Sequence, residues 1–335
     1  MKLSKDKLAD FLAAIPGKTV FGPQLSGETL RFTPVTRPGN LCPTVNNATV
    51  PPKSVVFPQT ETMFRFEQGA TDIRTAEPSG ETVLFGVRPC DARAMSIVDN
   101  VFFWDVDDPY YLIRRTNSAL VGLACLDPCV NCFCTSMGGG PASTEGLDIL
   151  LTDLGESYLL EVLTGKGEML CQSAEKLLSQ ASSADKEAAK MLQEKAAAQI
   201  SRQIDPSGIP ARLPALWESP IWEKISASCL GCGICTYLCP TCHCFDMQDE
   251  TEGEESRRYR TWDSCMFSEY TLHASGHNPR PTRRERTRNR INHKFSYFVD
   301  KFKVMACVGC GRCINLCPVN IDILDILSQV GEQAL

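Results

Sequence analysis

The stretch CLGCGICTYLCP (229–240) decides the architecture of the C-terminal half, and CVGCGRCINLCP (307–318) repeats its spacing. Each stretch has three cysteines with two residues between neighbours, then a fourth cysteine three residues later, followed by proline. In bacterial ferredoxins with this pattern, three thiolates hold one [4Fe–4S] cluster and the fourth thiolate ligates the other cluster. The sequence therefore predicts two clusters. The predicted ligand sets are Cys229, Cys232, Cys235 and Cys317 for one cluster, and Cys307, Cys310, Cys313 and Cys239 for the other.

The residues between these cysteines suit a cluster better than a zinc ion. Two-residue gaps wrap the backbone around three corners of a cube, and the glycines between the cysteines allow that close approach. The proline that follows the fourth cysteine ends the loop and removes an N–H group that would need a partner. Structural zinc sites usually join two separated C-x2-C pairs. Two even triples, each with a Cys-Pro, therefore favour iron–sulfur clusters over zinc.

Cysteine is also the outlier of the composition, with 18 in 335 residues. Disulfide-rich scaffolds are small and secreted, whereas the N-terminal segment 1–17 resembles a short amphipathic helix rather than a signal peptide. We therefore expect a cytoplasmic, reducing compartment in an organism from an oxygen-poor habitat. The net charge of −6 gives no indication of nucleic-acid binding. No apolar run reaches the roughly 20 residues of a membrane span.

The length suggests roughly two domains, and the predicted fold class is α+β. Residues 1–170 form a predicted mixed α/β domain, in which strand 81–87 precedes a helix and 121–126 is a second buried strand. Residues 171–214, rich in helix-forming residues, form a predicted helical connector. Residues 215–335 form a predicted, mainly helical, dicluster ferredoxin-type domain with an insert at 245–300.

A second group of cysteines lies in the first domain. Cys90 follows one predicted strand and the loop CLDPCVNCFC (125–134) follows another. Two strands that end near each other would bring Cys90 beside this loop, and four of the five thiols could then bind a third [4Fe–4S] cluster. Buried structural thiols or a zinc site are the alternatives, because the spacing is irregular. Cys42 and Cys171 are isolated and are interpreted as packed residues.

The insert contains further reactive residue types without a clear assignment. Cys242, Cys244 and Cys265 are surplus to the two ferredoxin clusters. With His243 or another thiol they would hold a further metal, or alone they would donate S–H hydrogen bonds to the cluster core. Six arginines fall between Arg280 and Arg290, followed by Lys294. They are interpreted as a solvated face, as partners of the acidic stretch 249–255, or as cations beside the anionic clusters that also dock an acidic partner.

Several motifs beyond the ferredoxin runs carry a family resemblance. FGVRPCDARAM (85–95), the loop from Cys125 to Pro141, and the CPTCHCFD, WDSCMF and GHNPRP segments resemble the iron–sulfur electron-transfer subunits of two kinds of enzyme. These are the β subunits of sulfhydrogenases and the corresponding subunits of anaerobic sulfite reductases. The resemblance spans residues 20–325. It implies a three-cluster electron carrier that works beside a flavin/NAD(P)-binding redox subunit and a separate catalytic subunit. It also implies that Cys129 is the extra thiol. The implied third ligand set is Cys90, Cys125, Cys132 and Cys134.

Motifs for other chemistries are missing from the sequence. There is no G-x-G-x-x-G after a strand, no phosphate-binding G-x-x-x-x-G-K-[ST] and no nucleophile elbow. The sequence therefore predicts an electron-transfer subunit with no catalytic residue of its own. Two alternatives remain: a reductase subunit that binds substrate at an incompletely ligated cluster, and a zinc-stabilised interaction module.

Overall fold

The computed structural model describes residues 1–43, 47–67, 69 and 72–333, which divide into two compact units. The first unit comprises Met1–Phe57, Pro78–Arg202 and Val308–Cys310. The second comprises Pro58–Glu77, Gln203–Cys307 and Gly311–Leu335. Both units are therefore assembled from separate stretches of the chain. The strand pair within 58–77 belongs to the second unit, which the sequence did not indicate.

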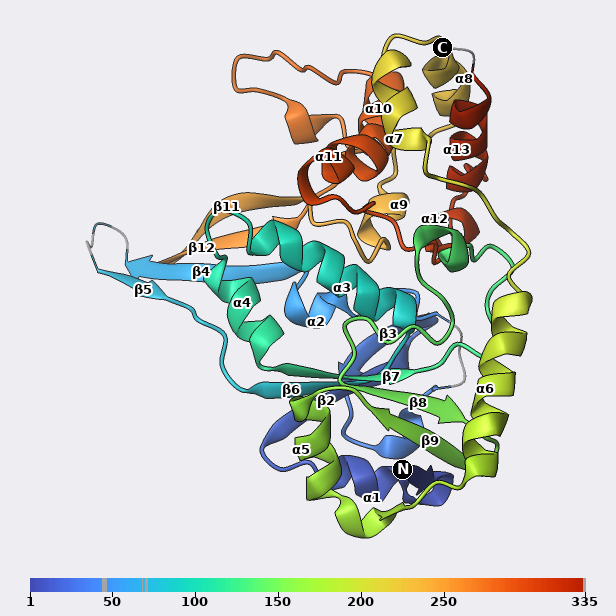
Figure 1. Cartoon of the computed structure of the whole chain (residues 1–335). Coiled ribbons are helices and arrows are strands. Elements are labelled where there is room, and N and C mark those ends of the chain that lie inside the picture. Colours follow the sequence, from blue (N-terminus) through green and yellow to red (C-terminus); the bar gives the residue numbers. More distant parts are fainter. Residues whose placement is uncertain (44–46, 68, 70–71, 334–335) are drawn as a thin grey trace. The chain divides into compact units, whose positions relative to one another are not determined.

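The first unit is built on an eight-stranded sheet of order β10-β1-β9-β8-β7-β6-β2-β3 (Figure 1). Four neighbouring strands, β8, β7, β6 and β2, run parallel, and the outer strands are antiparallel. The strands are β1 (Lys2–Ser4), β2 (Lys18–Ser26), β3 (Thr29–Pro34), β6 (Glu81–Val87), β7 (Ser118–Leu123), β8 (Ile149–Asp153), β9 (Ser157–Val162) and β10 (Leu178–Ser179). The helices are α1 (Leu8–Ala13), α2 (Lys53–Val56), α3 (Pro89–Phe102), α4 (Pro109–Thr116), α5 (Gly165–Ser173) and α6 (Ser183–Ala198).

Helices cover both faces of this sheet, as expected for parallel strands that are apolar on both sides. Phe85, Val121 and Leu151 point to the face that α1 and α5 cover, where they pack in one apolar cluster. The alternate residues Leu84 and Leu120 are equally buried and, by strand alternation, belong to the opposite face. Helix α3 covers that face of the sheet (Figure 1). The mixed α/β prediction is confirmed, as are the strand at 81–87 and the helix that follows it. The second predicted strand is also present, but at Ser118–Leu123, three residues before the predicted 121–126.

The N-terminal segment differs from its prediction. Instead of one helix over 1–17, residues 2–4 form β1 and only Leu8–Ala13 is α-helical. Leu3 pairs with Tyr158 of β9 and is fully buried. Backbone pairing with the sheet therefore overrides the helical periodicity of the first residues.

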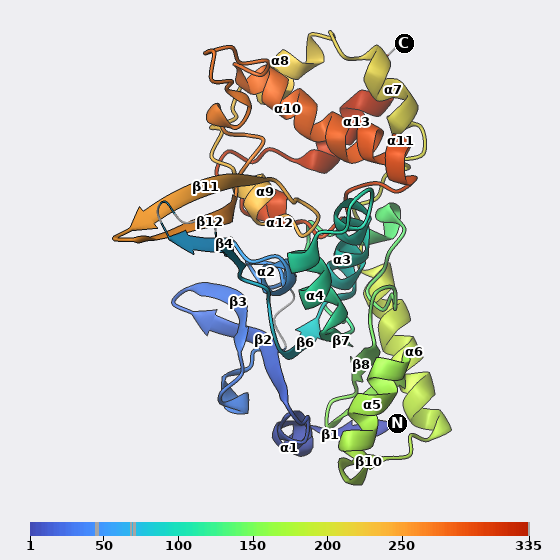
Figure 2. The ribbon, with the colours of Figure 1, turned by 90° about the vertical axis from the view of Figure 1, so that its left-hand side faces the viewer.

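The second unit combines short helices with a four-stranded antiparallel sheet of order β11-β12-β4-β5 (Figure 2). The strands are β4 (Thr60–Glu67), β5 (Ile73–Thr75), β11 (Phe245–Glu252) and β12 (Glu255–Trp262). The helices are α7 (Ile209–Ala215), α8 (Ile221–Ser226), α9 (Ile234–Tyr237), α10 (Arg283–Asn292), α11 (Phe298–Phe302), α12 (Arg312–Asn315) and α13 (Ile323–Glu332), with a π-helical turn at His293–Tyr297 between α10 and α11. The sequence did not indicate this sheet: the insert begins with a β-hairpin that pairs with β4, beside the expected helices. The helical-ferredoxin class itself stays a prediction.

A buried ion pair ties the hairpin to β4. Arg260 lies 2.7 Å from Glu61, and the two side chains are only 1% and 2% exposed. We expect Arg260→Ala to destabilise the second unit by about 3–5 kcal/mol, because it leaves the Glu61 carboxylate buried without its cation. Unfolding in urea without oxygen, followed by tryptophan fluorescence, measures the change.

The matched control lies on the same strand. Arg258 pairs with Asp249 at 2.7 Å, but both side chains are about half exposed, so Arg258→Ala should cost less than about 1 kcal/mol. Equal urea midpoints for the two variants would show that the buried pair does not stabilise the sheet.

Candidate iron–sulfur centres

The first ferredoxin motif surrounds a cavity in the second unit. Cys229, Cys232 and Cys235 line it, and Cys317 joins them from 82 residues beyond the last of these. Gly231 and Gly233 carry the chain between the cysteines at φ values of +68° and +76°, a conformation that favours glycine. The four predicted ligands of the first cluster therefore meet at one cavity.

Backbone amides already point at the sulfur atoms of this cavity. The N–H of Gly231 donates to Cys229 Sγ at 3.4 Å, and the N–H of Ile321 donates to Cys317 Sγ at 3.2 Å. Four soft sulfur ligands with amide donors around one cavity fit a [4Fe–4S] cluster. Cys232 is exposed and the adjacent Leu230 is 59% exposed, so the cavity reaches the protein surface on this side.

The second predicted ligand set is divided between the two units. Cys239, Cys307 and Cys313 belong to the second unit, whereas Cys310 lies in the segment Val308–Cys310 of the first unit. Within the second unit, the Lys294 ammonium donates to Cys239 Sγ at 3.3 Å and to the Ala306 carbonyl at 3.0 Å. This lysine therefore holds Cys239 close to Ala306, the residue immediately before Cys307.

Two buried cations, Arg290 and Lys294, face these cysteines. They lie four residues apart, so they project from the same side of the helical segment, and they are 6% and 3% exposed. Arg290 lines the first cavity together with Cys313. Burial opposes both positive charges, but the neighbouring thiolates, Cys235 and Cys239 foremost, outweigh it and raise the pKa of each cation above its ordinary value. Both residues therefore remain charged and face cysteine sulfur, which would be anionic as a cluster ligand.

The cysteines of the first unit gather where two parallel strands end. Val87 of β6 pairs with Gly122 of β7, so Cys90 and Cys125 follow the strands at the same edge of the sheet. The buried Arg88 joins the two loops by donating to the carbonyl of Leu123 at 3.1 Å. Burial lowers the pKa of Arg88, and the Cys125 and Cys90 thiolates oppose that shift. The sequence-based expectation that Cys90 lies near the 125–134 loop is thus confirmed.

All five thiols of this group interact. The Cys132 thiol is hydrogen-bonded to Cys129, which, with burial and the nearby Cys90 and Cys125, raises its pKa. Burial and Cys125 raise the pKa of Cys134 to about 11. Because Cys129 is hydrogen-bonded within this group, its assignment as the extra thiol stays a prediction. The donor set, four or five sulfurs of which Cys90, Cys125 and Cys129 interact with the buried Arg88 guanidinium, fits an iron–sulfur cluster.

The isolated cysteines and the histidines of the sequence analysis form no further metal-ion site among the described residues. Cys171 packs in the core of the first unit, as expected, and Cys42 is partly exposed beside the Asn40 carbonyl. The rings of His243 and His293 stack edge to face, with centroids 5.6 Å apart. In the described ranges 1–43, 47–67, 69 and 72–333, no three cysteine, histidine or carboxylate side chains converge as ligands of a single metal ion. Nor is any helix of these ranges long and apolar enough to cross a membrane.

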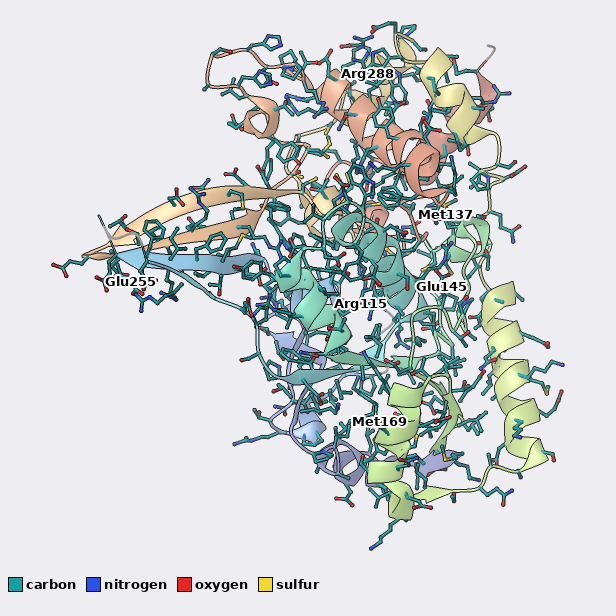
Figure 3. The ribbon with its side chains drawn as sticks, turned by 60° about the vertical axis from the view of Figure 1, so that its left-hand side comes forward. Arg115, Met137, Glu145, Met169, Glu255 and Arg288 are labelled. Carbon is teal, nitrogen blue, oxygen red and sulfur yellow. The ribbon has the colours of Figure 1, made fainter. Side chains whose placement is uncertain are left out.

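Half of the six arginines between Arg280 and Arg290 are buried, so the run does not form one solvated surface patch. Arg286, Arg288 and Arg290 are buried on α10, and the Arg288 guanidinium lies 3.8 Å from the centre of the Trp217 ring (Figure 3). The proposed pairing with the acidic stretch 249–255 is wrong, because two arginines of the hairpin itself pair with Glu250 and Asp249. The interpretation as cations beside the clusters agrees with the positions of Arg290 and Lys294. The sequence did not single out Arg290 and Lys294 as a pair. Their spacing of four residues, which places two side chains on one side of a helix, was the signal that could have identified them.

Comparisons with known proteins agree with this geometry. Residues 228–321 match the family described as a 4Fe-4S dicluster domain. The chain is 34% identical over 314 residues to sulfhydrogenase 2 subunit beta of Pyrococcus furiosus, an alignment that covers 93% of this chain and 92% of that protein. No solved structure matches the chain. The chain therefore belongs to the family of sulfhydrogenase beta subunits, and it is an iron–sulfur electron-transfer subunit.

Proposed function

We propose that this chain relays single electrons between a flavin/NAD(P)-binding redox subunit and a catalytic subunit of a cytoplasmic complex of the hydrogenase or sulfite reductase type. The observation that carries the proposal is the cavity where Cys317 meets Cys229, Cys232 and Cys235. Bound [4Fe–4S] clusters would supply one-electron chemistry. The relative's designation as a beta subunit supports a role beside other chains.

The residues of this chain hold the sulfur ligands in place during such transfer. Short helices and turns carry the cysteines, and the Gly231 and Ile321 amides donate to the thiolates. A ligand frame fixed in this way changes little between redox states, which keeps the cost of electron transfer low. The exposed Cys232 gives the first cavity a route to a partner surface.

A third cluster on Cys90, Cys125, Cys132 and Cys134 is part of the proposal. Its support is the convergence of these thiols at the shared end of β6 and β7. The buried Arg88 would offset part of the negative charge of a cluster with four thiolates. With three clusters, one centre belongs to the mixed α/β unit, and electrons pass between it and the two ferredoxin-type clusters.

Metal analysis tests this proposal. The chain purified without oxygen should contain about 12 iron and 12 acid-labile sulfide atoms, four of each per cluster. Cys125→Ser should remove about four iron atoms, because it deletes one ligand of the third centre. Cys171→Ser, which replaces a buried thiol in the apolar core of the same unit, should leave the iron content unchanged.

Other outcomes would change the proposal in defined ways. About 8 iron atoms in the wild type, unaffected by Cys125→Ser, would exclude the third cluster, and a preparation dominated by zinc would exclude the relay altogether. Purification of the untagged native complex tests the partners: a flavin-containing chain should accompany this protein, and recovery of this chain alone would contradict its role as part of a larger complex.

A further inference from the structure

Two cysteines that neither ferredoxin ligand set uses meet at the base of the β11–β12 hairpin. Cys244 immediately precedes β11, and Cys265 lies three residues beyond β12. Phe245 pairs with Trp262 at the end of the hairpin, and the Asp263 N–H donates to the Cys244 carbonyl at 3.0 Å. Strand pairing thus brings together two thiols that are 21 residues apart in sequence.

The Cys244 sulfur receives several hydrogen bonds. The Cys265 thiol, the Tyr270 hydroxyl and the Cys265 backbone N–H all donate to it. These donors, the Cys265 thiol foremost, outweigh burial and lower the pKa of Cys244 to about 6, whereas the same contact and burial raise the pKa of Cys265. At neutral pH the pair is therefore one thiolate and one thiol in direct contact, which is the reactive form of a dithiol.

The pair also lies next to a predicted cluster ligand. The thiol of Cys242 is hydrogen-bonded to Cys239 and lies within electrostatic range of Cys244. The charge of Lys294, which contacts Cys239, also favours the Cys244 thiolate. Cys242 therefore interacts both with Cys239 and with the Cys244 of the pair.

The surroundings favour a dithiol over a further metal site. A metal would need a fourth ligand besides Cys242, Cys244 and Cys265, and His243 was the sequence candidate. The His243 ring instead packs against His293, with its Nδ1 3.1 Å from the Thr241 carbonyl oxygen. Besides Cys265, Cys244 is hydrogen-bonded to the Tyr270 hydroxyl, which acts as a donor.

We propose that Cys244 and Cys265 form a redox-active dithiol that exchanges two electrons with the one-electron carriers of this subunit. On oxidation, the Cys244 thiolate and the Cys265 thiol form one S–S bond, releasing one proton from Cys265 and two electrons, which one-electron acceptors of the iron–sulfur class take up singly. Reduction reverses each step: two electrons break the S–S bond, and one proton returns to Cys265. The pair would allow a chain of one-electron carriers to exchange electrons with a partner that reacts in two-electron steps.

Counting electrons tests this inference independently of the number of clusters. The protein, oxidised with ferricyanide just until cluster absorption stops changing, is titrated with dithionite without oxygen. Cys244→Ser and Cys265→Ser should each accept two electrons fewer per chain than the wild type, with the same iron content. Cys42→Ser, which changes an isolated thiol outside this group, should accept as many electrons as the wild type.

A further variant keeps the pair but removes one donor. Tyr270→Phe should still accept the two extra electrons, but at a lower potential, because the reduced thiolate has lost a hydrogen bond. An unchanged electron count in both serine variants would overturn the proposal. A loss of about four iron atoms in either serine variant would also overturn it, since the thiols would then be cluster ligands. A low iron content in the wild type would instead count against the proposed relay.

Discussion

Cys317→Ser and Cys235→Ser are expected to abolish the same cluster signal, although 82 residues separate the two positions. Both side chains line one cavity in the second unit. In ferredoxins the fourth cysteine of each motif ligates the cluster of the other motif, so both substitutions remove a ligand of the same cluster. Each variant should lose about four iron atoms and one of the signals seen by EPR during reductive titration.

Cys313→Ser is the control that makes this prediction discriminating. Cys313 also borders the cavity, but it is assigned to the other cluster, so its replacement should abolish a different EPR signal. If each motif instead bound its own cluster with all four cysteines, Cys317→Ser and Cys313→Ser would abolish the same signal and Cys235→Ser the other. That result would contradict the crossed ligand sets.

The sequence predicted those parts of the molecule whose chemistry depends on local spacing. The ferredoxin motifs indicated their own clusters, and the buried strands 81–87 and 121–126 indicated why Cys90 lies near Cys125. Parallel neighbours end at the same edge of a sheet, and β6 and β7 are such neighbours. In both cases the residues that form the recognisable sequence pattern are the same residues that form the cluster site or the strand.

The β11–β12 hairpin was missed because its strands lack an apolar alternation. Every residue of β11 is exposed, so the stretch FDMQDETE looks like a solvated loop. The strand forms because its charged side chains pair across the hairpin, toward the tip that ends near Glu255 (Figure 3). These pairs, and the buried contact of Arg260 with Glu61, depend on register and on a segment almost 200 residues away, neither of which a local pattern reports.

The burial of α10 was unpredictable for a related reason. A helix with the sequence RRERTRNRIN suggests full exposure. Arg288 is nevertheless buried against Trp217, and Arg290 against cluster cysteines. The partners that make burial of these cations tolerable come from distant segments: Trp217 lies 71 residues before Arg288, and Cys235 lies 55 residues before Arg290. Unpaired, such a charge would be too costly to bury.

Arg290→Gln and Lys294→Gln are each expected to lower the reduction potential of a ferredoxin-type cluster. Each substitution removes one buried positive charge that faces cysteine sulfur, and Lys294 Nζ lies 3.3 Å from Cys239 Sγ. Reduction adds one negative charge to the centre, so it becomes less favourable when the cation is gone. With an effective dielectric constant near 20 and the added electron spread beyond the thiolate, the loss is about 2 kcal/mol. For a one-electron couple that corresponds to roughly 90 mV, which redox titration followed by EPR can measure.

Charge-conserving and exposed substitutions separate this electrostatic effect from a structural one. Arg290→Lys keeps the charge and should keep the potential within about 30 mV of the wild type. Arg284→Gln on the same helix removes a more exposed cation that pairs with Glu218, and solvent screening should limit its effect to a small fraction of that seen at position 290. A fall in potential of equal size in Arg290→Lys would mean that the arginine acts by packing, and no fall in either glutamine variant would mean that the buried cations balance the thiolates equally in both redox states.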